Sequence, residues 1–164
     1  MSCSVRSASR RCFSTAPPAL VELREYQLSP SGAASYLAAT QKAMPTRVKH
    51  LPLRFFALPE TGGMLNVATH AYAYPGGLQE RDAARAQCAA DPEWSEYLKE
   101  ARPSVVSQTS SLYTEAPFVA ELEGVHGMSS AFPFADADGG AIFELRRYQL
   151  QLGYDTVPRF FDLY

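Results

Sequence analysis

The sequence is poor in cysteine. Cys3 and Cys12 fall within the first twenty residues, so Cys88 is alone in the rest of the chain. One cysteine cannot form an internal disulfide, which excludes a secreted, disulfide-stabilised scaffold. Cys88 lies in an alanine-rich, helix-like stretch with no histidine near it in the sequence. We interpret it as a small buried hydrophobic side chain rather than a reactive thiol.

Long hydrophobic runs and basic clusters are also missing. No apolar run approaches the roughly 18 residues that cross a bilayer, so we expect no transmembrane segment. The net charge is −2, and the residues after the first twenty hold 12 basic and 17 acidic side chains. This acidic balance argues against a nucleic-acid partner, because binding to phosphates requires a basic surface.

The motifs of metal binding and catalysis are absent too. The three histidines are His50, His70 and His126, and no two of them, nor any His/Cys pair, have the spacing of metal ligands. The sequence contains no phosphate-binding loop, Ser/His/Asp arrangement or paired-carboxylate motif. We therefore expect no metal, no cofactor and no catalytic residue, and we favour a protein that is not an enzyme.

The first nineteen residues have the composition of a targeting segment. They are rich in Arg and Ser and contain no acidic residue. Arg11 and Phe13 resemble the arginine-plus-aromatic cleavage site of a mitochondrial presequence. We read residues 1–19 as a presequence for import into the mitochondrial matrix. A chloroplast transit peptide and a disordered basic tail are the alternatives.

A short stretch of the sequence occurs twice. Residues 21–28 read VELREYQL and residues 143–150 read FELRRYQL, so six of eight positions are identical at a constant offset of 122 residues. Repetition at a fixed spacing indicates a duplicated unit. The sequence therefore predicts one full unit followed by the opening of a second, either in a fragment of a longer tandem protein or in a gene that has lost its second half.

In the first unit, strand-like and helix-like stretches are separated by Gly and Pro residues, which mark turns and breaks. We predict strands over residues 20–28, 53–58, 64–74 and 105–113. We predict helices from residue 33, over residues 78–90, and from residue 92 until Pro103 stops the last one. In the first helix Leu37, Met44 and Val48 form an apolar stripe, and Pro45 should kink the helix or mark its last regular turn.

The resulting order, β-α-β-β-α(α)-β, is typical of an α+β domain of the ferredoxin-like, or split βαβ, type. We expect this domain over residues 20–114, a linker over residues 115–140, and the truncated start of a second domain over residues 141–164. The second copy should begin with a strand over residues 142–150 that docks on the first unit or hangs free. In a ferredoxin-like sheet the first and third strands are neighbours at the centre.

Four short motifs occur in order along the first unit. They are ELREY at residues 22–26 followed by Pro30 and Gly32, HAYAY at residues 70–74, RDAAR at residues 81–85, and DPEW at residues 91–94. Together they resemble the NIPSNAP family, whose corresponding strand reads H-x-W-x-Y, so that Tyr72 stands in place of the usual tryptophan. The resemblance covers about residues 21–113, and the second copy resembles the opening of another NIPSNAP domain.

The resemblance implies a mitochondrial protein with tandem domains of the dimeric α+β-barrel type. It also implies scaffolding and quality-control signalling rather than an established reaction. We therefore expect the domain to pair with a second copy, as a homodimer or within a tandem chain, and to contact other mitochondrial proteins. A non-enzymatic scaffold or adaptor is the function that the sequence favours.

Alternation along the first and third strands gathers polar and aromatic side chains on one sheet face. These residues are Glu22, Arg24, Tyr26, His70, Tyr72 and Tyr74. We expect the small apolar residues on the other face to pack under the helices, and the polar-aromatic face to point away, toward a second sheet. This face is either a bonded network that fixes the packing of the two sheets or the lining of a small-molecule pocket.

The pocket hypothesis gives each residue a role. Arg24 would hold an anionic group, Tyr26 and Tyr72 would stack on a planar ligand, and His70 would act as a base or axial haem ligand. The protein would then be a cofactor-free monooxygenase or a haem-binding protein, by analogy with other barrels of this fold.

The remaining motif residues favour structural roles. Arg81 and Arg85 lie one helical turn apart and could clamp an anion, although such pairs more often form a solvated face that bonds nearby acids. Asp91 is a predicted N-cap, Pro92 suits the first helical position, and Trp94 is a predicted core anchor.

Overall fold

Residues 19–61, 63–116 and 146–162 are described by the computed structural model of the protein. The first unit contains β1 (Leu20–Leu28), α1 (Ala33–His50), β2 (Leu53–Ala57), β3 (Val67–Tyr74), α2 (Gly77–Ala90), α3 (Pro92–Ala101), a 3₁₀ turn (Arg102–Ser104) and β4 (Val105–Thr114). A short helix, α4 (Thr156–Phe161), follows in the C-terminal segment. The predicted order of elements in the first unit is confirmed.

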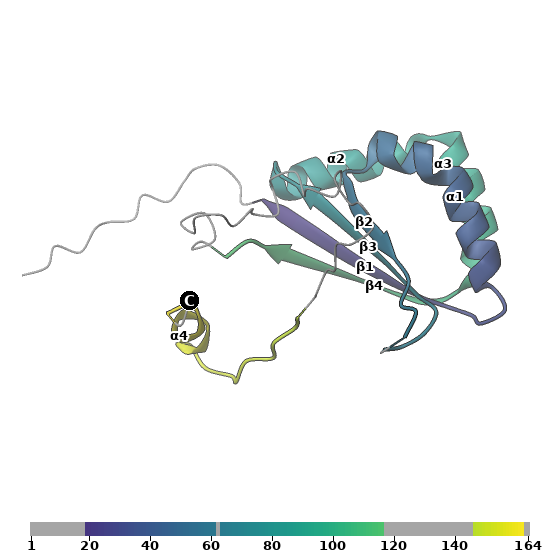
Figure 1. Ribbon diagram of the computed structural model, residues 1–164. Helices are drawn as coiled ribbons and strands as arrows, with labels where there is room; N and C mark the ends of the chain where they lie inside the picture. Colours follow the sequence, from purple (N-terminus) through teal and green to yellow (C-terminus); the bar gives the residue numbers. More distant parts are fainter. Residues whose placement is uncertain (1–18, 62, 117–145, 163–164) are drawn as a thin grey trace, which may run out of the picture.

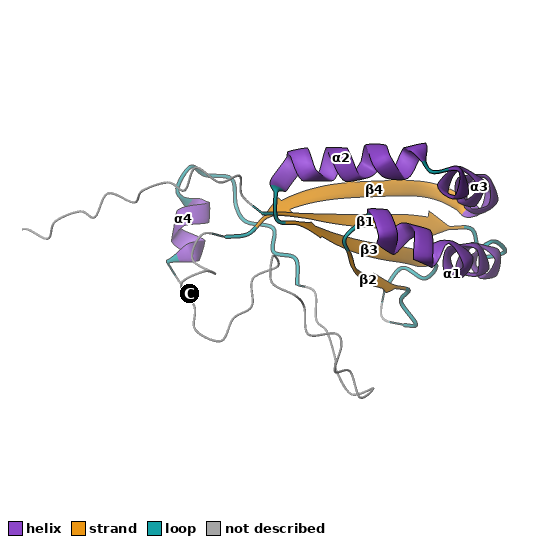
Figure 2. Ribbon diagram, turned by 90° about the horizontal axis from the view of Figure 1, so that it is seen from above, coloured by secondary structure: helices purple, strands orange, loops and turns teal. Residues whose placement is uncertain are grey.

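The four strands form one antiparallel sheet in the order β2-β3-β1-β4. β1 and β3 are the two central strands and pair along their length, as predicted. The helices α1, α2 and α3 cover one face of this sheet, and α4 lies on its other side (Figures 1 and 2). This arrangement is the predicted ferredoxin-like α+β fold.

The turn after β1 depends on a close approach to the start of β4. The backbone N–H of Ser29 donates to the carbonyl oxygen of Ser104 at 2.9 Å. A Cβ atom added to Gly32 would lie 2.6 Å from the Ser29 Oγ and 2.8 Å from the Ser104 Cβ. Gly32 therefore permits the contact that leads the chain from β1 into α1.

Helix α1 excludes one of the two alternatives for Pro45 and corrects the expected buried face. It continues past Pro45 to His50, so Pro45 does not mark its last regular turn, and Figure 1 shows the helix curving over the sheet. The predicted apolar stripe is not the buried face, because Leu37 is 39% exposed and Val48 is 56% exposed. The buried residues of α1 are Tyr36, Ala39, Thr40, Ala43, Thr46 and Arg47. This face is polar because Tyr36 and Arg47 bond to the sheet, while Thr40 and Thr46 bond to α3.

The polar-aromatic face of the sheet packs against the helices, which corrects the expectation that it points away from them. Arg85 of α2 donates to Glu22 of β1. Arg47 of α1 donates to His70 of β3, while the small residues of β3 such as Ala71 lie on the opposite face. Strand alternation shows which residues share a face but does not show which face the helices cover. Burial of polar groups is tolerated here because the helices supply their partners.

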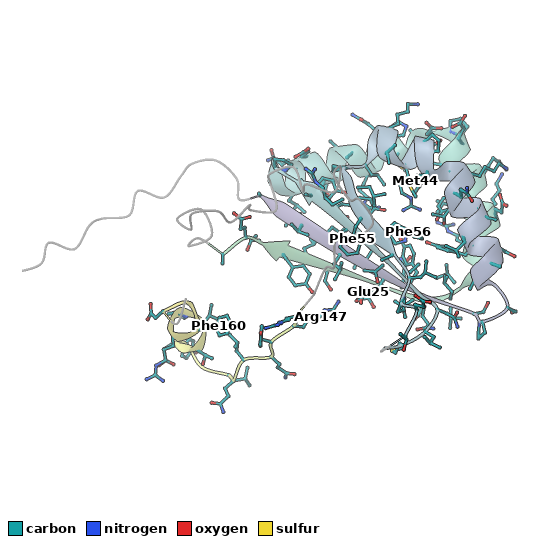
Figure 3. The ribbon with its side chains drawn as sticks, in the orientation of Figure 1. Glu25, Met44, Phe55, Phe56, Arg147 and Phe160 are labelled. Carbon is teal, nitrogen blue, oxygen red and sulfur yellow. The ribbon has the colours of Figure 1, made fainter. Side chains whose placement is uncertain are left out.

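The described part of the second sequence copy is not a strand. Residues 146–150 have no regular secondary structure and are not a strand of the four-stranded sheet. Residues 142–145 and the predicted linker from residue 117 to residue 140 lie outside the described residues. Arg147 of this segment forms an ion pair with the first unit, in which its Nη2 lies 2.9 Å from Glu25 Oε2 (Figure 3). Tyr148 packs on Phe160 of α4 with ring centroids 5.8 Å apart.

Candidate functional site

A buried carboxylate on the central strand joins the sheet to α2. Glu22 is fully buried, and its Oε1 accepts from Arg81 Nη2 at 2.9 Å and from Ser110 Oγ at 2.8 Å. Its Oε2 accepts from Arg85 Nη2 at 2.5 Å and from the Tyr74 hydroxyl at 3.4 Å. A carboxylate has about four lone-pair sites, so these four donors saturate it.

The ionisation of Glu22 follows from these contacts. Burial alone would raise its pKa, but hydrogen bonds from Arg81 and Arg85 outweigh burial and lower the pKa to about 2. Glu22 is therefore ionised at neutral pH and cannot serve as an acid that donates a proton there. The same bonds raise the pKa of Arg81, so the pair stays charged.

A second polar group is centred on Arg47, which is 2% exposed. Its Nη1 donates to His70 Nδ1 at 2.8 Å and to the Tyr72 hydroxyl at 2.6 Å. Its Nη2 donates to the Tyr97 hydroxyl at 2.7 Å. The guanidinium also lies 5.0 Å from the centroid of the Trp94 ring, within the range of a cation–π contact. Arg47 thus ties α1 to β3 and to α3.

These bonds define the state of His70. Arginine only donates, so Nδ1 of His70 must accept and the ring is neutral with its proton on Nε2. That proton points to the Tyr36 hydroxyl, 3.0 Å away. Burial, reinforced by the nearby charge of Arg47, lowers the pKa of His70 to about 2. Both ring nitrogens are used inside the protein, so in this arrangement His70 offers neither nitrogen to a ligand.

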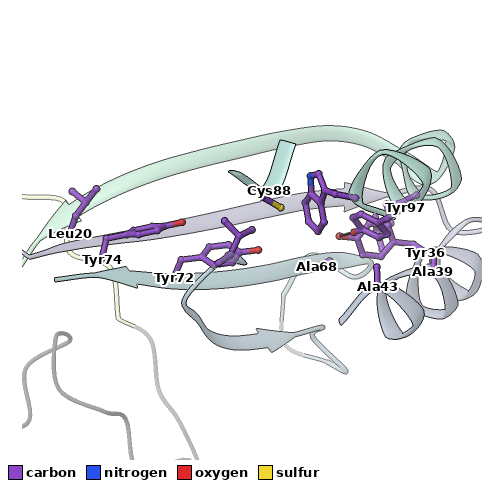
Figure 4. Close-up of a cluster of buried hydrophobic side chains, with 13 residues drawn as sticks. Leu20, Tyr36, Ala39, Ala43, Ala68, Tyr72, Tyr74, Cys88 and Tyr97 are labelled. Atoms are coloured by element: carbon purple, nitrogen blue, oxygen red, sulfur yellow. Dashed lines mark hydrogen bonds between the residues drawn. The ribbon is translucent and has the colours of Figure 1, made fainter. Parts of the chain in front are cut away.

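Aromatic contacts connect the two polar groups beneath the helices. His70, Tyr72 and Tyr74 stack in sequence along β3, with centroids 6.2 Å and then 6.5 Å apart. The Arg85 guanidinium lies 5.0 Å from the centroid of the Tyr72 ring. Figure 4 shows Tyr72 and Tyr74 lying along the strand, with Tyr36 and Tyr97 beyond them. The result is one continuous polar-aromatic core between the sheet and α1–α3.

The structure brings all six predicted barrel-interior residues together on the helix-covered face. Arg81 and Arg85 join them, which corrects the prediction of a solvated helix face. The expected bond to Asp82 exists at Arg81 Nη1, but both arginines also bond the buried Glu22. These two arginines therefore do clamp an anion, and that anion is a side chain of the protein.

Two members of the core were missed from the sequence, namely Tyr36 and Arg47. A signal for them exists, because Tyr36, Ala43 and Arg47 recur at helical spacing along α1. This stripe is less apolar than the neighbouring stripe of Leu37, Met44 and Val48, so hydrophobicity alone does not select it. Nothing in the sequence indicated that the sheet beneath this helix would be polar.

The predicted structural residues of α3 are confirmed. Asp91 caps the helix by accepting from the Glu93 N–H at 2.9 Å, and Pro92 occupies the first turn. Hydrogen bonding from His50 lowers the pKa of Asp91 to about 2. Trp94 is buried in the core, and so is Cys88. Burial raises the pKa of the Cys88 thiol, as expected for an unreactive side chain.

Among the described residues, no group of three or more His, Cys, Asp or Glu side chains is arranged to hold a metal ion. No helix in this part of the chain has the length and hydrophobicity required to cross a membrane.

The sequence profile of the NIPSNAP family matches residues 21–120, which is more than half of the chain. The chain belongs to the NIPSNAP family. The family motifs meet in the structure, because the buried Glu22 of the first motif bonds both arginines of the R-x-x-x-R helix. His70 and Tyr72 of the third strand bond Arg47. The motifs thus mark the contacts that hold the helices on the sheet.

Solved bacterial NIPSNAP structures are similar to this domain. An uncharacterized NIPSNAP domain protein from Burkholderia xenovorans is 27% identical with a TM-score of 0.56, over 60% of this chain and 96% of that one. A NIPSNAP family protein with unknown function from Agrobacterium tumefaciens is 25% identical with a TM-score of 0.56, over 62% of this chain and 91% of that one. Another NIPSNAP family protein from the same bacterium is 20% identical with a TM-score of 0.57, over 61% of this chain and 95% of that one. No curated protein matches the chain.

Proposed function

We propose that the protein is a non-enzymatic scaffold or adaptor of the mitochondrial matrix that acts through contacts with other proteins. The observation that carries this proposal is the internal use of the polar core. The four lone-pair sites of Glu22 and both ring nitrogens of His70 are engaged by other side chains. Glu22 and His70, the residues that could take part in catalysis, instead form hydrogen bonds that hold the helices on the sheet.

The pocket hypothesis receives less support from this geometry. A general base or axial haem ligand must present an accessible nitrogen with a suitable pKa. His70 has no exposed surface, and the charge of Arg47 opposes its protonation. To act on a ligand, His70 would first have to break its bonds to Arg47 and Tyr36.

Pairing between repeat copies is the first contact that we propose. Glu25 and Arg147 occupy equivalent positions of the two copies, 122 residues apart, and form an ion pair. The same contact between two first copies would oppose Glu25 to Glu25, and like charges repel. The charges therefore favour a first copy paired with a second, as in a tandem chain, over a homodimer of first copies.

The mitochondrial part of the proposal depends on residues 1–19, whose arginine- and serine-rich, acid-free composition suits import. Cross-linking mass spectrometry on isolated mitochondria tests the whole proposal. We expect reproducible links between other matrix proteins and the exposed lysines of the helical layer, Lys42, Lys49 and Lys99. Recovery of the protein free of links to any other protein, or its absence from mitochondria, would overturn it.

A further inference from the structure

The helix-covered face of β1 holds more positive than negative charge. The guanidinium groups of Arg24, Arg81 and Arg85 surround the single buried carboxylate of Glu22. The exposed Asp82 bonds Arg81 from the solvent side and supplies a second negative charge. Three cations against two anions leave one uncompensated positive charge in the cluster.

That charge belongs to Arg24. Its Nη1 lies 3.6 Å from Glu22 Oε1, beyond hydrogen-bond distance, because the lone pairs of that carboxylate are already taken. The Arg24 side chain is only 15% exposed, and its guanidinium lies 5.4 Å from the centroid of the Tyr26 ring. Among the described residues, the buried Nε of Arg24 has no hydrogen-bond partner. A largely buried guanidinium whose Nε–H lacks an acceptor is costly unless a ligand supplies one.

Arg85, which bonds the same carboxylate, also has a nitrogen without a hydrogen-bond acceptor. Its Nη2 donates to Glu22, while its buried Nε finds no acceptor in the part of the chain that the structure describes. The side chains of Arg81 and Arg85 are 21% and 22% exposed. Each of the three arginine side chains thus keeps part of its surface exposed to solvent.

We propose that Arg24, assisted by Arg85, binds a small oxyanion of the carboxylate or phosphate class at the place where β1 faces α2. A guanidinium fork matches the two oxygens of either group and binds them with two parallel hydrogen bonds. Tyr26 limits the site on one side through its contact with Arg24. The site is separate from the bonded nitrogens of His70, so it goes beyond the scaffold proposal and stands or fails independently of it.

Thermal unfolding of the purified full chain tests the site. Inorganic phosphate and acetate should each be compared with sodium chloride at the same ionic strength, since screening alone acts on every surface charge. We expect at least one of the two to raise the Tm above the chloride value, because a ligand that binds only the folded state stabilises it. The anion that gives the larger rise identifies the class of ligand.

Substitution of Arg24 separates binding from a structural role. In Arg24→Gln the anion-dependent rise should vanish, and calorimetric affinity should fall at least about tenfold, as expected for loss of a charged hydrogen-bonded pair. Its Tm in chloride should be equal to or above that of the wild type, because one of three clustered positive charges is gone. The exposed Arg102, replaced in Arg102→Gln, provides the matched control and should keep the full response.

The same experiments contain the results that would overturn the site. An equal rise in wild type and Arg24→Gln would place the anion elsewhere. If neither phosphate nor acetate binds the wild-type chain more than chloride does, the proposal fails whatever the variants do. If Arg24→Gln does not fold, Arg24→Lys serves instead, since it keeps the charge and loses the fork. Undiminished affinity in Arg24→Lys would contradict the bidentate site.

Discussion

Arg147 donates from Nη2 to Oε2 of Glu25 at 2.9 Å, and these two residues occupy the same position in the two copies of the repeat. This is the single polar position at which VELREYQL and FELRRYQL differ. The substitution reverses the charge, so the two copies are complementary where they touch. Figure 3 shows the two side chains on the side of the sheet away from the helices.

Charge reversal at this pair should change the order of the C-terminal segment. Glu25→Arg opposes two arginines and should increase hydrogen exchange in residues 146–162, while the double variant Glu25→Arg with Arg147→Glu should restore the wild-type rate. The pair is exposed, so its contribution is small, about 0.2–1 kcal/mol, and screened by salt. Glu60→Arg is the control on an exposed loop. Equal exchange in all four proteins would show that the ion pair does not hold the segment.

Lowering the pH should destabilise the domain from pH 6.5 downward because of His70. Its pKa is about 2 in the folded protein against 6.5 when unfolded. In the unfolded chain His70 therefore binds a proton that it does not bind in the folded protein. The free energy of unfolding falls as the pH drops toward 2. Between pH 7 and pH 5 this loss is about 2 kcal/mol. Glu22, whose folded pKa of about 2 also lies below its usual 4.5, adds a further loss at lower pH.

Denaturant unfolding at pH 7 and pH 5 measures this effect. His70→Gln removes the titrating group, so its stability should fall less over this interval than that of the wild type. His50→Gln should keep the contribution of His70, since His50 bonds Asp91 at the far end of α1. Identical pH dependence in wild type and His70→Gln would contradict a neutral, buried His70.

Tyr72→Phe should cost about 1–3 kcal/mol of stability. The Tyr72 hydroxyl accepts from Arg47 at 2.6 Å, and removing it leaves a buried guanidinium short of one acceptor. Tyr113→Phe is the matched control, because Tyr113 is 45% exposed on β4, and we expect a change within about 0.5 kcal/mol. Chemical denaturation of both variants gives the comparison. A neutral Tyr72→Phe would mean that water or another group replaces the hydroxyl.

The order of the elements in the first unit could be predicted because their signals are local. Asp91 and Pro92 mark the start of α3 by cap chemistry that does not depend on the rest of the fold. The central pairing of β1 with β3 followed from the order of elements once the ferredoxin-like pattern was recognised. The polar-aromatic residues were grouped correctly because strand alternation has a fixed period.

The partners of those residues could not be predicted in the same way. A hydrophobic stripe is the usual mark of a buried helix face, and in α1 this rule selects Leu37 and Val48, which are exposed. The face that packs on the sheet carries Arg47, whose burial is favourable only because His70, Tyr72 and Tyr97 accept its hydrogen bonds. Burial of such a group depends on residues that are distant in sequence and meet only in the fold.

Import into the matrix predicts a processed protein. Mass spectrometry of the chain isolated from cells should find a mature N-terminus between Phe13 and Leu20, after removal of the arginine-rich segment. Protein that is recovered from cells with residues 1–12 intact would contradict the import reading.

The central proposal is that the buried polar core holds the NIPSNAP domain together rather than binding a haem or performing catalysis. The absorption spectrum of the purified full chain, compared between wild type and His70→Gln at equal folded fraction, tests this claim most directly. We predict two superimposable spectra without absorption in the visible range, with the variant differing only in stability. A Soret band in the wild type that is lost in His70→Gln would contradict the account.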